Sequence, residues 1–597
     1  MRSLFDWLDH RTGYRGMLRA VLFEHIPGGA RWRYVWGSTL TFAIVVQFIT
    51  GIFLWMAYSP SAQTAWESVF YLQEHVPGGW IVRGIHHWTA QIMVPLLVLH
   101  LMQVVIDGAY KAPREVNYWF GIALMGVVLA LSLTGYLLPW DQKGFWATKV
   151  ATNLLASIPA IGPSLQRIVI GGPDYGHQTL TRFFALHAGV LPALLVALIV
   201  GHIYLFRRHG ITPKRPLRLP DARFWPDQVL KDAVACLAVM AAVLTLVWLN
   251  RGAELTAPAN PADNYSAARP DWYFMSLFEL LKFQEYFPGK NLVWGSVIIP
   301  SAIVLFLLVM PLWSRWRVMH GFNLAGLWLG LAAFCWLTFL AMRHDARDPH
   351  FAAAVKQGAR DAARAKQIAI THGIPPIGAL ELLRDDPLTQ GPKIFAAKCS
   401  SCHSYDGHDG LGVPLQDKQT AAELKGWGSR DWLRSFMDPE KIATDRWWGG
   451  TAFVHPPPGK SKGKMVDYVL EDVAKFDAAQ KQQLNDAIVA LSAEAALPAQ
   501  RDDDKHAATQ IATGRVAMGE TQLNCIDCHS FRGEGGGTGP DLTGWASREW
   551  TIGIIENPAH KRFYDRRNDR MPAYGEKHEL TKRQIEMVAD WLRGDWQ

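Results

Sequence analysis

The chain has 597 residues and a formal net charge of +7, a length that predicts several domains. A mean hydropathy of +0.02 hides a division, since the first 342 residues are mostly long apolar runs and the rest is charged. The basic excess lies beside the apolar runs, as is typical of loops at a membrane face, so we expect no nucleic-acid partner.

Seven segments in the first half are apolar for about 20 residues or more, the length that crosses a hydrocarbon core of ~30 Å. They lie near residues 34–57, 81–106, 116–138, 184–206, 229–249, 292–313 and 322–342. We therefore predict an all-α, seven-helix multi-pass bundle surrounded by membrane lipid. The polar, basic start MRSLFDWLDHRTGYRG has no apolar core, so no cleavable signal peptide is expected.

Basic residues cluster in the N-terminal segment, in the 207–231 loop and in the 314–320 loop. All three fall on one side if every apolar run crosses once, and Lys and Arg mark the cytoplasmic side. The N-terminus is therefore expected in the cytoplasm. Seven crossings then place the residues after 342 outside it, which predicts a protein of the cell inner membrane with a periplasmic C-terminal part.

Two apolar segments each carry a pair of histidines, which are costly in a membrane span unless they have a partner. His86 and His100 are 14 residues apart, about 40° short of four helical turns. His187 and His202 are 15 apart, about 60° off one face. His87 would turn about 140° away from His100. Each pair can therefore face one seam at two depths. Because imidazole binds haem iron, the sequence predicts two noncovalent b-type haems.

Glycines repeat this spacing on the first and third expected helices. Gly37 and Gly51 are 14 residues apart, and so are Gly121 and Gly135. Glycine lets a flat ring approach the backbone, although small residues also serve ordinary helix packing in membranes. Because the spacing matches that of the histidines, we expect all four glycines to contact haem.

The segment 343–388 is expected to be a connector, helical in part, that either lies on the membrane surface or is a solvated spacer. Beyond it, CSSCH (399–403) and CIDCH (525–529) match the C-x-x-C-H signature of c-type haem attachment. A bare C-x-x-C could be redox-active or bind zinc, but a histidine directly after it, twice, favours two covalent haems. The expected attachment thiols and iron ligands are Cys399, Cys402, Cys525, Cys528, His403 and His529.

The C-terminal part contains an internal repeat, since GWGSRDW (426–432) matches GWASREW (544–550). Both repeats resemble small helical cytochrome c domains. In the second repeat, DRMPAYGE predicts Met571 as the sixth iron ligand. In the first, KMVDYV indicates Met465, but the stretch lacks the proline and follows an insertion, so His455 stays a competitor.

The N-terminal half resembles the cytochrome b subunit of quinol-oxidising Rieske–cytochrome b complexes, over residues 1–342. The matching motifs are RGIHHW (83–88), KAPRE (111–115), LTGYLLPWDQKGFWA (133–147), SIPAIG (157–162), LTRFFALH (180–187) and PDWYF (270–274), together with His100 and His202. The last three helices look like the separate smaller subunit of the chloroplast bf type, here fused. Where that protein tethers an additional haem through a cysteine, this chain has Val35, so no such third haem is expected.

The resemblance implies that His86 and His187 bind the outer haem and that His100 and His202 bind the inner one. It also implies that two arginines close to the outer ligands pair with haem propionates, the alternative being interfacial side chains that reach for water. These arginines are Arg83 and Arg182.

The resemblance further implies quinol oxidation at PDWYF, where the family carries a glutamate and this chain has Asp271, one methylene shorter. A carboxylate whose pKa lies near the working pH can accept the proton that quinol loses. Tyr136 and Tyr273 are further pocket candidates. Arg207 and Asp232 are candidates for an inner quinone site, although Arg207 also fits the basic bias of cytoplasmic loops.

We expect five segments in chain order. They are a four-helix bis-haem domain (1–215), a three-helix domain with the quinol motif (216–342), the connector (343–388) and two cytochrome c domains (389–497 and 498–597).

The resemblance implies a quinol:cytochrome c reductase subunit that works in a homodimeric complex. It would pass electrons through the b haems to the quinone pool, and through the c haems to a soluble cytochrome c or a terminal oxidase. The Rieske protein must be another polypeptide, because the cysteines outside the two C-x-x-C-H motifs are only Cys236 and Cys335. The alternative is a haem-bearing membrane anchor or electron conduit of a different dehydrogenase or reductase.

Overall fold

The computed structural model describes residues 2–213, 217, 220–415, 419–568 and 570–596. It divides into two compact units, residues 1–380 and 381–597, and each is described by itself. The expected domain boundary at 215/216 lies outside the described residues.

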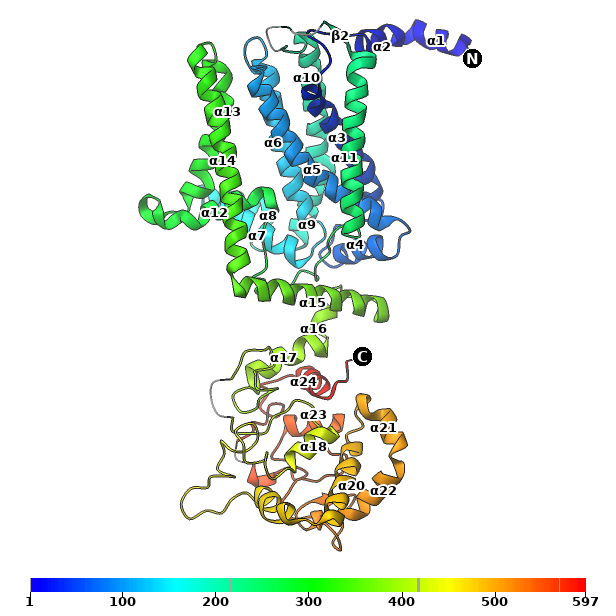
Figure 1. Ribbon diagram of the computed structural model, residues 1–597, viewed down its shortest axis with the longest axis vertical. Coiled ribbons are helices and arrows are strands. Elements are labelled where there is room, and N and C mark those ends of the chain that lie inside the picture. The colour runs from blue at the N-terminus through cyan, green and yellow to red at the C-terminus, as the bar shows by residue number, and fades with distance from the viewer. Residues whose placement is uncertain (1, 214–216, 218–219, 416–418, 569, 597) are drawn as a thin grey trace. The chain divides into compact units, whose positions relative to one another are not determined.

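Seven long apolar helices dominate the described part of the first unit, and each is long enough to cross a membrane (Figure 1). The helices are α3 (Val35–Trp55), α5 (Gly79–Ile106), α6 (Glu115–Tyr136), α10 (Leu191–His209), α11 (Val229–Leu249), α13 (Ile299–Trp313) and α14 (Arg317–Arg347). Helix α13 reaches the length of a span together with the preceding π turn η7 (Trp294–Ile298). This confirms the predicted all-α, multi-pass architecture.

Shorter elements join these helices or extend beyond their ends. They are α1 (Arg2–Thr12), α2 (Tyr14–Leu22), α4 (Ala65–Glu74), α7 (Gln142–Ala156), α8 (Gly162–Ile170), α9 (His177–Ala185), α12 (Met275–Lys282) and α15 (Pro349–His372), with a small antiparallel pair of β1 (His25–Ile26) and β2 (Ala222–Arg223). Helix α15 lies in the expected connector, and it packs on the unit because Gly358 abuts the ring of Tyr265.

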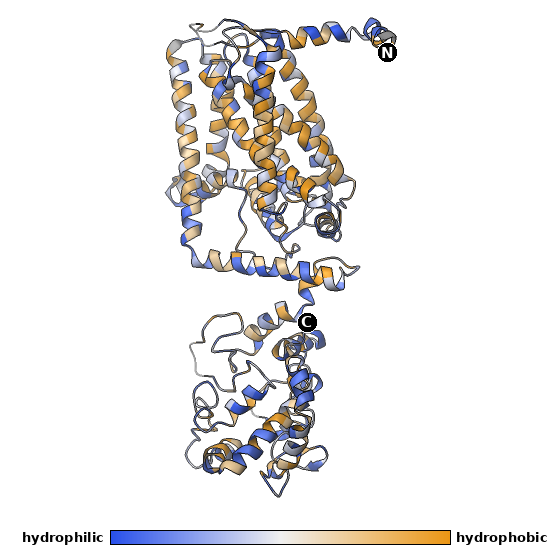
Figure 2. Ribbon diagram, turned by 45° about the vertical axis from the view of Figure 1, so that its right-hand side comes forward, coloured by the Kyte–Doolittle hydropathy of each residue, from blue (hydrophilic) through white to orange (hydrophobic). Residues whose placement is uncertain are grey.

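The bundle is held by helix pairs, since α3 packs on α5, α6 packs on α10, and α11 packs on both α3 and α5. The interior cluster of the pairs contains Ala43, Met93, Val127, Val128 and Leu195. Large apolar side chains such as Phe53, Leu237 and Trp248 are exposed on the outside, and apolar residues predominate along the long helices (Figure 2). Such an exterior suits lipid as the surrounding solvent.

The second unit is mostly short helices. They are α16 (Glu381–Arg384), α17 (Pro387–Lys398), α18 (Arg430–Phe436), α19 (Lys464–Asp467), α20 (Ala478–Glu494), α21 (Arg501–His506), α22 (Ala508–Ala517), α23 (Arg548–Glu556) and α24 (Lys582–Arg593), with a hairpin of β3 (Ser530–Phe531) and β4 (Glu534–Gly535).

The internal repeat is visible in local structure. The side chains of Ser429 and Ser547 cap α18 and α23 by accepting the backbone N–H of Trp432 and Trp550. Each of these indoles donates to a main-chain carbonyl, at 2.7 Å for Trp432 and 2.9 Å for Trp550. The repeated GW-x-S-x-x-W pattern is therefore a capped helix whose tryptophan fixes the preceding loop.

Packing in the second unit crosses from one repeat to the other. The first helix of the first repeat, α17, packs on the last helix of the second, α24, while α20 of the first repeat packs on α22 of the second. Both repeats thus lie in one compact unit, and the packing runs across the expected boundary at 497/498.

Candidate functional site

The two histidine pairs face each other between α5 and the α10 segment. The ring centroids of His86 and His187 are 6.3 Å apart, and those of His100 and His202 are 6.5 Å apart. Metal–imidazole bonds of ~2.0–2.1 Å place two rings on opposite sides of one ion roughly 6–6.5 Å apart, centre to centre. Both pairs therefore have the separation that two axial ligands of one haem iron require. His87 instead contacts the ring of Trp88.

A π-helical turn explains how a 15-residue spacing aligns the second pair. The turn η2 (Leu186–Val190) contains His187 and leads directly into α10. A π turn holds one more residue than an α turn, so the helix between His187 and His202 runs as if the two were 14 residues apart. The alignment then matches that of His86 and His100.

Each predicted glycine lies beside one predicted histidine, and the nearest atom is Cε1 of that ring in every case. A Cβ added at the glycine would lie 3.7 Å from His100 at Gly37, 3.4 Å from His86 at Gly51, 3.4 Å from His202 at Gly121 and 2.6 Å from His187 at Gly135. The missing side chains thus leave room at the imidazoles, where a bound porphyrin would have to pass close to the backbone. This geometry supports haem at both levels.

Two threonines orient the histidines of the first pair. Thr50 Oγ1 lies 2.9 Å from His86 Nδ1, and Thr134 Oγ1 lies 3.2 Å from His187 Nδ1. A partner at Nδ1 fixes the ring and leaves Nε2 for a metal. Sequence analysis missed both threonines, although each directly precedes a predicted glycine, as Thr-Gly at 50–51 and again at 134–135.

The second pair is supported differently. His202 Nδ1 lies 3.0 Å from the carbonyl oxygen of Asn117. The Nδ1 atom of His100 is buried and has no hydrogen-bond partner within the described ranges. The two levels therefore differ in how firmly their imidazoles are held.

The arginines predicted near haem propionates have protein partners. Arg83 is buried and donates to the carbonyl oxygens of Ala253 at 2.8 Å and Glu254 at 2.6 Å. Arg182 donates to the carbonyl oxygen of Ile168 at 2.5 Å. Arg83 therefore ties α5 to the loop after α11, and propionate contacts from either arginine stay a prediction.

The candidates for an inner quinone site also have partners. Arg207 forms an ion pair with Glu24 at 3.1 Å. Asp232 is buried and accepts hydrogen bonds from Ser38 and Gln228, each at 2.8 Å. A quinone contact at these residues stays a prediction.

The PDWYF motif brings two of the predicted quinol-site residues together. Asp271 precedes the turn η4 (Trp272–Phe274), and its carboxylate accepts a hydrogen bond from the Tyr273 hydroxyl at 2.8 Å. Burial raises the pKa of Asp271, while the Tyr273 hydroxyl opposes the rise. A raised pKa moves this carboxylate toward the range in which it exchanges protons at working pH.

Further side chains surround this carboxylate. The Tyr136 hydroxyl donates to the carbonyl oxygen of Arg269 at 3.3 Å, two residues before Asp271. The Trp272 indole donates to Gln91 Oε1 at 3.0 Å, and the neighbouring Gln91 side chain also opposes the rise in the pKa of Asp271. Gln91 was not predicted, because a lone glutamine on an apolar helix carries no motif.

The two C-x-x-C-H motifs have the same local geometry. His403 Nδ1 donates to the carbonyl oxygen of Ala422, and His529 Nδ1 to that of Pro540, both at 2.8 Å. In each case Nε2 is left to bind iron. Burial raises the pKa of Cys399 to about 12 and of Cys525 to about 11, so both thiols are protonated at neutral pH wherever they are not converted to thioethers.

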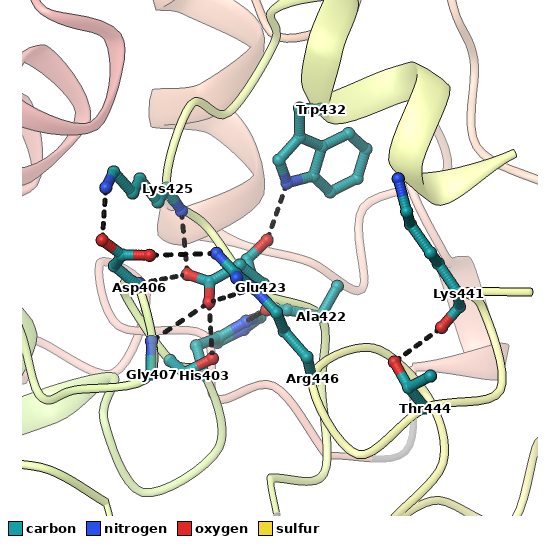
Figure 3. A network of polar contacts seen from close by, with 11 residues as sticks. His403, Asp406, Gly407, Ala422, Glu423, Lys425, Trp432, Lys441, Thr444 and Arg446 are labelled. Carbon is teal, nitrogen blue, oxygen red and sulfur yellow. Dashed lines mark hydrogen bonds and ion pairs between the residues drawn. The ribbon is translucent and has the colours of Figure 1, made fainter. Parts of the chain in front are cut away.

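A buried carboxylate organises the loop behind the first motif (Figure 3). Glu423 is 2% exposed, and its oxygens accept the backbone N–H of Asp406 at 2.7 Å and the hydroxyl of Ser404 at 3.1 Å. Arg446 lies 3.3 Å from the same carboxylate. Because Glu423 follows Ala422, whose carbonyl oxygen accepts from His403, this network fixes the orientation of the His403 ring.

We expect Glu423→Gln to lower the free energy of unfolding of the second unit by about 2 kcal/mol, since hydrogen bonds to a charged acceptor contribute ~1.5–3 kcal/mol. An amide nitrogen would also face backbone donors. Chemical denaturation of the haem-loaded protein measures the change. Glu440→Gln, at an exposed carboxylate, is the matched control and should stay within about 0.5 kcal/mol of the parent. Equal free energies of unfolding for Glu423→Gln and Glu440→Gln would contradict the proposed role of Glu423 in holding the loop.

The predicted sixth ligands lie in apolar surroundings. Met571 packs against a cluster that also borders Cys399, and Met465 packs against a cluster with Val454 and Val466. His455, the competitor in the first repeat, is exposed. Its exposure favours Met465 as the ligand from that repeat.

Comparison with known proteins finds two families along the chain. Residues 91–267 match the family described as "Cytochrome b(N-terminal)/b6/petB", and residues 511–596 match the cytochrome c family. A solved structure of a hyperthermophilic respiratory Complex III shares 27% identity and a TM-score of 0.49, covering 63% of this chain and 99% of that one.

Relatives with curated descriptions cover the first half. The menaquinol:cytochrome c reductase cytochrome b subunits of Geobacillus thermodenitrificans and Bacillus subtilis (strain 168) are each 40% identical over 220 residues, which is 36% of this chain and 98% of each relative. Cytochrome b of Rhodobacter capsulatus is 33% identical over 291 residues, which is 46% of this chain and 66% of that protein.

Proposed function

We propose that this chain oxidises quinol at the outer membrane face together with a separate Rieske iron–sulfur protein. The chain belongs to the cytochrome b family found in quinol:cytochrome c reductases, and it also carries a cytochrome c domain. It is an integral membrane protein of electron transport. The proposal is carried by the two facing histidine pairs, each lined by glycines.

When bound, the haems supply one-electron redox chemistry. His86 with His187 would hold the outer haem, and His100 with His202 the inner one. The two histidine levels would thus hold two redox centres between the outer face and a quinone on the cytoplasmic side, to which one electron from quinol would pass. Moving that charge against the membrane potential stores ~2.3 kcal/mol per 100 mV.

At the outer face, Asp271 would accept a proton as quinol is oxidised, because burial raises the pKa of this carboxyl. The Tyr273 hydroxyl orients the carboxylate, and Tyr136 and Gln91 shape the surroundings. Arg207 remains our candidate for the inner quinone site.

The second unit would carry the other electron. We propose that haems attached at CSSCH and CIDCH take it from the Rieske partner and deliver it to a soluble cytochrome c or a terminal oxidase. This requires the N-terminus to be cytoplasmic and the second unit periplasmic, in line with the basic loops at 207–231. The complex is expected to be a homodimer.

A redox titration of the purified complex with quinol tests the proposal. Quinol should reduce the b haems rapidly only when the iron–sulfur centre is present and oxidised, because the two electrons of quinol must leave on separate paths. The matched control is the same complex stripped of its Rieske partner. Equal b-haem reduction by quinol in both samples would instead indicate a simple electron conduit.

A further inference from the structure

The two repeats of the second unit pack against each other through helices near their ends. Helix α17 crosses α24 at Gly391, where an added Cβ would lie 2.2 Å from Cβ of Trp591. Helix α22 crosses α20 at Gly514, where an added Cβ would lie 1.9 Å from the carbonyl oxygen of Asp486. The first repeat thus contributes α17 and α20 to the two crossings, and the second contributes α24 and α22. A glycine permits the close approach in both.

Each candidate methionine is followed three residues later by a tyrosine, in Met465-Val-Asp-Tyr468 and Met571-Pro-Ala-Tyr574. The Tyr574 hydroxyl donates to the carbonyl oxygen of Lys398 at 2.5 Å, directly before the CSSCH motif. The Tyr468 hydroxyl donates to the carbonyl oxygen of Leu523 at 3.2 Å, two residues before the CIDCH motif. Both hydrogen bonds run from one repeat to the attachment motif of the other.

The surroundings of the tyrosines agree with these hydrogen bonds. Met571 and Cys399 pack against the same cluster, which contains Phe395 and Tyr574. Burial, followed by the neighbouring Cys399 thiol, raises the pKa of Tyr574 to about 12. Burial, followed by the Cys525 thiol, likewise raises the pKa of Tyr468.

We propose that the two repeats exchange their sixth iron ligands, so that Met571 binds the haem attached at CSSCH and Met465 binds the haem attached at CIDCH. Three residues of chain reach at most ~11 Å, so the hydrogen bond of Tyr574 to Lys398 holds Met571 beside the first motif. The inference rests on the covalent attachment proposed above and deepens it. Each haem crevice is then complete only when both repeats are folded.

Replacing Cys525 and Cys528 by alanine in the full chain, within the complex, leaves CSSCH as the single site of covalent haem. In this background, Met571→His should lower the midpoint potential of the remaining c haem, because a thioether ligand raises the potential and an imidazole does not. Met465→His is the matched control and should leave that potential unchanged. A changed midpoint potential in Met465→His, or an unchanged one in Met571→His, would overturn the proposed exchange of ligands.

A second measurement leaves both methionines in place. Sulfur bound to iron is shielded from oxidation to the sulfoxide. After mild oxidation of the Cys525/Cys528 variant, peptide masses should show Met571 protected and Met465 oxidised, and the reverse pattern overturns the exchange. The mass of the CSSCH peptide reports separately whether haem is attached, so failed attachment and failed exchange are distinguished.

Discussion

The Gly135→Ala variant is expected to lose the haem that we propose at His187 and to keep the haem that we propose between His100 and His202. An added Cβ would lie 2.6 Å from His187 Cε1, inside van der Waals contact. The ring cannot move aside without giving up Thr134, 3.2 Å away, and the carbonyl oxygen of Leu131, 3.0 Å away. Noncovalent haem should fall from two per chain to one, and quinol oxidation at least ~100-fold, since even ligand-supporting groups contribute 10–100-fold.

Gly126→Ala is the matched control for this variant. Gly126 lies on the same helix, α6, and an added Cβ there meets no described atom within 4 Å. Alanine favours a helix over glycine by ~1 kcal/mol, so neither substitution harms α6 by itself. Haem extraction and optical titration distinguish the two variants. Full noncovalent haem content in Gly135→Ala would show that no porphyrin lies at this glycine.

Asp271→Asn is expected to slow quinol oxidation by ~10²–10⁴-fold, the usual contribution of a positioned proton acceptor, with haem content unchanged. An amide keeps the shape of the carboxylate but cannot take up a proton. Steady-state quinol:cytochrome c reductase assays measure the rate, and haem spectra confirm that the protein is intact. Asp271→Glu, which restores the carboxylate at one methylene longer, should recover most of the rate. An asparagine variant as fast as the parent would remove Asp271 from the mechanism.

The same residue predicts a pH dependence. If the deprotonated carboxylate is the proton acceptor, as we propose, the rate should fall as pH falls through the pKa of Asp271. Burial raises that pKa, which places the fall at higher pH than for an exposed aspartate, whose pKa is ~3.9. Tyr273→Phe removes a hydrogen bond that lowers the pKa, so the fall should move to still higher pH. A fall at unchanged or lower pH in this variant would contradict the contact.

Most of the membrane half could be predicted from sequence, because its signals are local. A span needs only a long apolar run. In the second unit, CSSCH and CIDCH are equally local signals, because each is complete within five residues. The matched spacings predicted that each glycine lies beside a histidine. They did not predict which histidine lies beside which glycine. The π turn at His187 could not be predicted from sequence, since no residue pattern in Leu186–Val190 distinguishes it from an α turn.

The packing of each repeat against the other could not be predicted from sequence, for a different reason. Matching motifs such as GWGSRDW and GWASREW indicate two copies of one fold, and the simplest expectation is that each copy packs on itself. Whether α17 packs on α20 or on α24 depends on contacts between residues far apart in the chain. Local propensity is the same for both arrangements, so only the three-dimensional structure distinguishes them.

The packing of α17 against α24 also sets an order for biogenesis. Phe395 meets Trp591 with ring centroids 5.5 Å apart, yet nearly 200 residues separate the two along the chain. At a synthesis rate of 5–20 residues per second, the first helix waits about 10–40 s for its partner. If haem is attached at CSSCH as proposed, attachment can take place in that interval, before α24 packs beside the motif. A premature stop that removes α24 would then leave α17 without its packing partner and affect the first haem site.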